Sequence, residues 1–285
     1  MFGKCLKHEF RATRRQLVPL FLAMIAVGFA AGLLIALGGL FLSSEGGILY
    51  ALVNGLLPVL LIFGLFGLMV AVEVVAFVMI IRRFYTSFFT DEGYLSFTLP
   101  VTVTEHILSK FVVAAVWQFL AGVVSLIAMA LVGGGALLGY GFHEGFAEEF
   151  ALVWDEMSFA FSEVGMGLGA SNAFFVTFFI LLILTVIISV GSSIFLLYFS
   201  ISLGCMLAKK HRVLAGIASY YVITTAFSMV SGFIQTILQF TTLASGSFEP
   251  ALLGIMISSL VLTIVQLIVC YIGTKWILTK KLNLD

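Results

Sequence analysis

The feature that most constrains this sequence is a series of long apolar runs separated by short polar segments. A helix of about 20 apolar residues crosses the hydrocarbon core of a bilayer. The chain is 10% charged, whereas soluble globular domains average about 25% charged residues. We therefore predict an all-α integral membrane protein with six transmembrane helices, whose spans are 17–41, 51–81, 107–140, 173–208, 214–240 and 251–274.

The charged side chains alternate between the segments that join these runs. All 14 basic residues lie before the first run, between the second and third runs or at the start of the third, between the fourth and fifth, or after the sixth: Lys4, Lys7, Arg11, Arg14, Arg15, Arg82, Arg83, Lys110, Lys209, Lys210, Arg212, Lys275, Lys280 and Lys281. Basic residues are retained on the cytoplasmic side of a membrane. We therefore predict that both termini are cytoplasmic.

The opposite connections carry acids and no bases: Glu45, Glu144, Glu148, Glu149, Asp155, Glu156, Glu163 and Glu249. Either this surface is simply solvated, or it attracts cations and cationic peptides. The longest of these connections, 141–172, has apolar residues at steps of three and four from Phe142 to Val164. That spacing predicts an amphipathic helix in an extracytoplasmic loop.

The N-terminal residues 1–16 also have a helical pattern. Phe2, Leu6, Phe10 and Thr13 share one face, and most of the remaining positions are basic or His8. A basic amphipathic helix of this kind lies in the membrane interface. We predict such an interfacial helix; the alternative is a positive segment that only fixes the topology.

Small residues recur at a spacing of four within two of the apolar runs, as Gly28, Gly32 and Ala36, and as Gly135 and Gly139. Ridges of this kind allow two helices to approach closely. From the sequence they serve either packing within one chain or contact between two copies.

The sequence lacks the motifs of common membrane enzymes. No phosphate-binding loop of the form G-x-x-x-x-G-K-[ST] is present, and His8–Glu9 lacks the second histidine of a zinc-protease helix. We therefore expect no catalytic residue, no metal site and no cofactor held by this chain itself.

Glu73 is the one acidic residue inside a predicted span. It lies nine residues before Arg82, about 13 Å into the hydrocarbon core, where a charge costs a few kcal/mol. Glu73 is either part of a substrate pathway with Asn54 and Gln118, or a neutral acid that joins two helices by a hydrogen bond. Further candidate partners are Gln235, Gln239 and Gln266.

The segment 82–106, which we call the elbow, interrupts the apolar runs on the predicted cytoplasmic side. Connections between packed helices usually take about 2–8 residues, and this one takes about 25. Asp91–Glu92–Gly93 has turn chemistry, and Thr102 with Glu105 forms the pattern of a capping box that starts the next helix. The excess length predicts a docking surface for a cytoplasmic partner.

The run DEGYLSFTLPVTVTEHILSKF, residues 91–111, resembles the inner-loop signature of bacterial ABC transporter permeases of the second exporter type. The matching positions are Gly93, Tyr94, Leu95, Phe97, Thr98, Leu99, Pro100, Val101 and Lys110. The basic N-terminal helix, the six spans and the cytoplasmic termini fit the same family over the whole chain.

The resemblance implies that the elbow carries a coupling helix that docks on a separate ATPase subunit, which binds ATP and Mg²⁺. The residues implied in docking are Asp91, Glu92, Gly93, Tyr94, Leu95, Phe97, Leu99, Pro100, Lys209 and Lys210. It also implies pairing with a second permease copy or a paralogue, in a bacterial plasma membrane.

We therefore expect the permease subunit of an ATP-driven exporter of a hydrophobic or cationic substrate such as a peptide, an antibiotic or a lipid. The alternatives are a proton-coupled secondary transporter that uses Glu73, and a membrane sensor or scaffold without transport.

Overall fold

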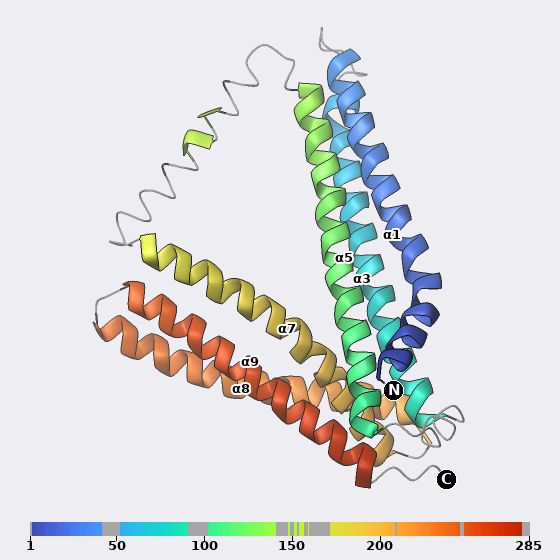
Figure 1. Cartoon of the computed structure of the whole chain (residues 1–285). Helices are drawn as coiled ribbons and strands as arrows, with labels where there is room; N and C mark the ends of the chain where they lie inside the picture. Colours follow the sequence, from blue (N-terminus) through green and yellow to red (C-terminus); the bar gives the residue numbers. More distant parts are fainter. Residues whose placement is uncertain are drawn as a thin grey trace. The chain divides into compact units, whose positions relative to one another are not determined.

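The computed structural model describes residues 2–41, 52–90, 102–140, 148, 151–152, 154–156, 159, 172–208, 210–245 and 248–280. These residues contain helices and no strand (Figure 1). The elements in chain order are α1 (Phe2–Phe41), the π-helix η1 (Leu52–Leu56), α3 (Leu57–Phe89), α5 (Val103–Tyr140), α7 (Asn172–Leu207), α8 (Arg212–Ser245) and α9 (Phe248–Lys280).

Six of the described helices are long and apolar enough to cross a membrane, as predicted. The shortest of them has 33 residues and the longest, α1, has 40. At a rise of 1.5 Å per residue α1 is about 60 Å long, twice the thickness of the hydrocarbon core. Each helix therefore contains a membrane span and continues beyond it. Large apolar side chains such as Phe63, Leu126 and Phe233 are exposed on the isolated chain, as lipid-facing residues are.

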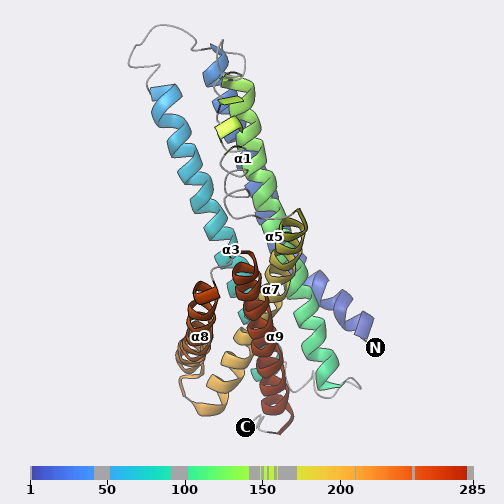
Figure 2. The ribbon, with the colours of Figure 1, turned by 90° about the vertical axis from the view of Figure 1, so that its left-hand side faces the viewer.

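The chain divides into two compact units. One unit comprises Phe10–Met79 and Val116–Ala160. In it α1 and α5 run side by side in both views (Figures 1 and 2). The indole N–H of Trp117 on α5 donates a 2.8 Å hydrogen bond to Thr13 Oγ1 on α1, and the rings of Phe10 and Phe21 pack against the same indole.

The predicted small-residue ridges meet within this unit. A Cβ atom added at Gly135 would overlap the backbone of Gly32, and one added at Gly139 would lie 2.8 Å from Ile35 O. A Cβ added at Gly28 would lie 3.0 Å from Ala128. The ridges on α1 and α5 therefore pack against each other within one chain, which decides between the two uses that the sequence left open for them.

The other unit comprises Met1–Glu9, Ile80–Ala115 and Phe161–Asp285. Its helix α7 packs against both α8 and α9, and the three helices are grouped together in Figure 1. The backbones of α7 and α8 approach closely at Gly204, where an added Cβ would overlap the backbone of Gly216. The segments that flank the elbow lie in the same core cluster as α7 and α9.

The predicted interfacial helix is continuous with the first span, because α1 runs from Phe2 to Phe41 without interruption. Along residues 2–16 the predicted apolar face is the less exposed one: Thr13 is buried, and Phe2, Leu6 and Phe10 are half-buried. The basic side chains of this segment are exposed. The amphipathic pattern is confirmed, whereas the location of this segment in the membrane interface stays a prediction.

One further prediction concerns the longest of the opposite connections. In the segment 141–172 the structure describes only 148, 151–152, 154–156, 159 and Asn172; those from 148 to 159 are helical, and the rest of the predicted amphipathic helix lies outside the described residues. Pro58 lies in the first turn of α3, directly after η1.

Candidate functional site

The two ends of the elbow are held by different local structures. At its C-terminal end the predicted capping box is confirmed: the Thr102 N–H donates to Glu105 Oε2 over 3.0 Å, and the Glu105 N–H donates to Thr102 Oγ1 over 3.3 Å. The backbone N–H and then the hydroxyl of Thr102 lower the pKa of Glu105 below its ordinary value of 4.5. These bonds satisfy N–H groups that the helix itself cannot pair, so α5 begins at Val103.

A three-residue ion-pair cluster joins α1 to both helices that flank the elbow. Glu9 on α1 accepts a hydrogen bond of 2.8 Å from Arg83 Nε on α3 and one of 2.5 Å from Lys110 Nζ on α5. Lys110 Nζ also donates to Ser87 Oγ on α3 over 2.9 Å. The Lys110 side chain is only 5% exposed and that of Glu9 is 12% exposed, so both charges are compensated inside the protein rather than by water.

Glu9 precedes the predicted first span by eight residues and lies outside it. Burial raises the pKa of Glu9, while the charge and hydrogen bond of Lys110 and those of Arg83 lower it, and together they hold the pKa below its ordinary value of 4.5. Glu9 is therefore ionised at neutral pH, and the cluster consists of one anion between two cations.

Aromatic side chains surround the same place. The rings of Phe84 on α3 and Tyr198 on α7 are stacked with centroids 4.0 Å apart and planes inclined by 8°. The Phe88 ring packs edge-on against His106 of α5. Lys110 Nζ lies 5.6 Å from the centroid of the Phe88 ring. Phe84, Phe88, Ile107 and Tyr198 are all at most 1% exposed. Side chains packed this closely transmit displacement, because a dense interior has little free volume.

Arg212, at the start of α8, completes the set of contacts. Its Nη1 lies 3.5 Å from the carbonyl oxygen of Phe89, the last residue of α3. The last two turns of α3 thus contact α5 through Phe88, α7 through Phe84 and α8 through Arg212. A force applied to the elbow would reach four helices within one or two side-chain contacts.

The predicted docking residues on the elbow, Asp91, Glu92, Gly93, Tyr94, Leu95, Phe97, Leu99 and Pro100, lie outside the described residues, as does Lys209. Lys210 is exposed and lines a pocket with Tyr85 and Arg212. The structure therefore describes what holds the elbow at both ends but not the surface predicted for docking.

The predicted substrate-pathway residues are partly brought together. Gln118 Nε2 on α5 donates a hydrogen bond to Glu73 Oε2 on α3, so Gln118 is the candidate partner that the structure places against Glu73. A role of these residues in a substrate pathway stays a prediction. Both side chains are half-buried. Asn54 lies in η1, where its side chain is not described. The Glu73–Gln118 pair joins two helices, as expected for a polar contact inside a membrane.

Sequence reasoning missed Glu9. In the sequence it appears only as one acid among the basic residues of the N-terminal segment. The available signal was its position in the helical pattern: it follows Cys5 by four residues and precedes Thr13 by four, and these three residues are all less exposed than the bases around them. An acid on the protected face of an otherwise basic helix predicts a buried cationic partner.

Comparison with models of protein families, with curated proteins and with solved structures found no match. The described residues form six long apolar helices, and a cluster of ion pairs joins three of them. The chain is a multi-pass helical membrane protein.

Proposed function

We propose that this chain is the membrane-spanning permease subunit of an ATP-driven ABC exporter. A separate ATPase subunit would bind ATP and Mg²⁺ and dock on the elbow. The observation on which the proposal rests is the combination of the elbow sequence from Gly93 to Val101 with the structure of its two ends. That motif resembles the docking loop of such permeases, and both of its flanks are fixed to neighbouring helices.

The contacts around the elbow would allow it to transmit a movement of the ATPase to the membrane helices. A docked ATPase would displace the elbow when it closes on ATP. Two contacts join the flanks of the elbow: the Phe88 ring packs against His106, and Lys110 donates a hydrogen bond to Ser87. Arg83 on the first flank is ion-paired with Glu9 of α1. Displacement of the elbow would therefore move α3 and α5 as a pair, and α1 with them through Glu9.

The acidic residues on the opposite connections favour a cationic substrate or one with a cationic group, since a surface of one charge sign attracts the opposite sign. Apolar spans suit a substrate with a large apolar part. A hydrophobic or cationic peptide, an antibiotic or a lipid has this chemistry. A second permease copy or a paralogue would complete the transporter.

The test is affinity purification of the tagged chain from its native membrane. We expect a subunit with a phosphate-binding loop to be retained by the wild type. Replacing Glu92, Tyr94 and Leu95 together by alanine should release it, while the variant still inserts into the membrane. Retention of the same ATPase by the triple variant would remove the docking assignment.

A proton-coupled secondary transporter remains the second candidate, because Glu73 is hydrogen-bonded to Gln118 in the membrane part of the chain. The two candidates differ in their energy source. Transport in vesicles that persists without ATP and stops when the proton gradient is collapsed would favour the secondary transporter.

A further inference from the structure

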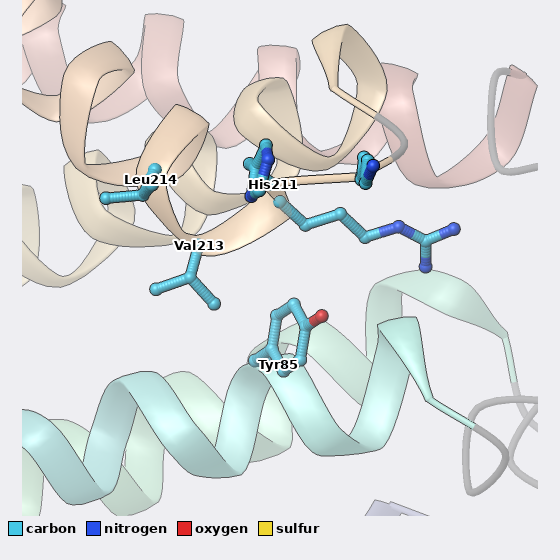
Figure 3. A pocket seen from close by; sticks show the side chains of 6 residues that line it. Tyr85, His211, Val213 and Leu214 are labelled. Atoms are coloured by element: carbon cyan, nitrogen blue, oxygen red, sulfur yellow. The ribbon is translucent and has the colours of Figure 1, made fainter.

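A pocket of about 300 Å³ lies where α8 begins beside the last turns of α3. Its lining is formed by Tyr85, Lys210, His211, Arg212, Val213 and Leu214. Figure 3 shows the Val213 side chain pointing toward the Tyr85 ring from the opposite wall. All six residues belong to the same compact unit.

The chemistry of the lining changes sharply along α8. Lys210 and Arg212 provide two permanent positive charges, and Tyr85 provides a hydroxyl group. Val213 and Leu214, which come next, are 63% and 65% exposed. Arg212 uses one guanidinium nitrogen for the contact with Phe89 O, and a guanidinium group has five N–H donors. The pocket thus pairs cationic donors with an exposed apolar surface.

The predicted span boundaries place the pocket at the depth of lipid headgroups. The predicted second span ends at 81, so Tyr85 lies about 6 Å beyond the hydrocarbon core. Leu214 is the first residue of the predicted fifth span. The headgroup layer accounts for the difference between a core of about 30 Å and a total thickness of about 40–45 Å, which leaves about 5–7 Å on each side. The charged wall is therefore level with lipid phosphates, and the apolar wall with the first acyl carbons.

We propose that this pocket binds the phosphate group of an anionic phospholipid in the leaflet that the basic segments face. Lys210 and Arg212 contact the phosphate oxygens, Tyr85 donates a hydrogen bond, and Val213 and Leu214 pack against the glycerol and acyl carbons. Basic pockets between transmembrane helices are recognised sites for such headgroups. The resemblance assigned Lys210 to ATPase docking instead; the adjoining exposed apolar residues at bilayer depth favour a lipid.

The experiment titrates the purified full-length chain in detergent with phosphatidylglycerol and, separately, with phosphatidylcholine, and counts bound lipids by native mass spectrometry. The variants are Lys210→Ala, Arg212→Ala and the two combined. Lys280→Ala is the matched control, because it removes the same charge from an exposed position in the same unit without touching the pocket. Lys210 is exposed, so its substitution keeps the test valid even where Arg212→Ala affects folding.

We expect each substitution in the pocket to weaken phosphatidylglycerol binding about fivefold, because each removes a direct hydrogen bond to the phosphate that is worth about 1 kcal/mol. Lys280→Ala should bind as the wild type does, and inorganic phosphate at equal concentration should not displace the lipid. Unchanged binding in the pocket variants, or an equal loss in Lys280→Ala, would overturn the proposal. Displacement by inorganic phosphate would show a site for the free ion, and loss of a co-purified ATPase with unchanged lipid binding would show a protein contact.

Discussion

Lys110 Nζ lies 2.5 Å from Glu9 Oε1, which fixes the start of α5 to a residue 101 positions earlier in the chain. The same carboxylate accepts a hydrogen bond from Arg83 of α3. Three helices that flank or face the elbow are therefore joined at one side chain.

Replacing Glu9 by alanine should destabilise the folded chain by about 3 kcal/mol, because the buried charge of Lys110 loses its anionic partner. Lys7→Ala is the control on the same helix, since Lys7 is exposed and exposed substitutions usually change stability by less than about 0.5 kcal/mol. Denaturant unfolding of the purified proteins in detergent measures both. Equal midpoints for Glu9→Ala and the wild type would show that the cluster contributes nothing to stability.

The stability that Glu9 provides should depend on pH in a defined direction. Its pKa is lowered in the folded chain, so its contribution is complete above its ordinary pKa of 4.5 and is lost as the pH falls through the lowered value. We expect the difference in unfolding free energy between the wild type and Glu9→Gln to be constant near neutral pH and to shrink below 4.5. A difference that grows on acidification would mean that the carboxyl group is neutral in the folded chain.

The contact between α1 and α5 predicts opposite effects for two neighbouring glycines. Gly135→Ala places a methyl group against the backbone of Gly32, and overpacking of this kind costs about 1–3 kcal/mol. Gly134→Ala meets no atom within 4 Å and should stabilise the helix by up to about 1 kcal/mol, since alanine is the better helix former. Unfolding of both variants in detergent checks the signs, and a loss of equal size for both would contradict the close approach at Gly135.

Glu73→Gln should leave membrane expression and unfolding close to those of the wild type, because an amide can keep a hydrogen bond with Gln118. If the chain is part of an ATP-driven exporter, the Glu73→Gln variant should also transport at the rate of the wild type. Loss of transport with normal expression would instead favour the proton-coupled candidate. The measurement is uptake into inverted vesicles, with ATP and with a proton gradient in separate samples.

The sequence predicts most of the fold because bilayer physics demands long apolar helices, and all six predicted spans overlap a described helix. The predicted ends were less accurate where helices continue outside the bilayer. The second span was expected to end at 81, but α3 continues to Phe89 because Phe84 and Phe88 are buried against Tyr198 and His106. Polarity marks where a span leaves the hydrocarbon, not where the helix ends.

Within the candidate site, the sequence predicted contacts between residues close together in the chain more readily than contacts between distant ones. The Thr102–Glu105 capping box follows from a spacing of three residues, and the structure has it. The pairing of Glu73 with Gln118 was one of several options, since many polar residues lie in the spans. The Glu9–Lys110 contact depends on which helices are neighbours and on their register, and neither is encoded by the residues near Glu9. Long-range ion pairs of this kind need the tertiary structure.

ATPase docking on the elbow and the exporter assignment both require that the elbow faces the cytoplasm. Tyr94→Cys, in a chain whose Cys5, Cys205 and Cys270 are replaced by alanine, can be labelled with a membrane-impermeant thiol reagent in intact cells, with Glu144→Cys as the control for the opposite side. We predict that Glu144→Cys is labelled in intact cells and that Tyr94→Cys is labelled only after the membrane is opened. Labelling of Tyr94→Cys in intact cells would contradict both ATPase docking on the elbow and the exporter assignment.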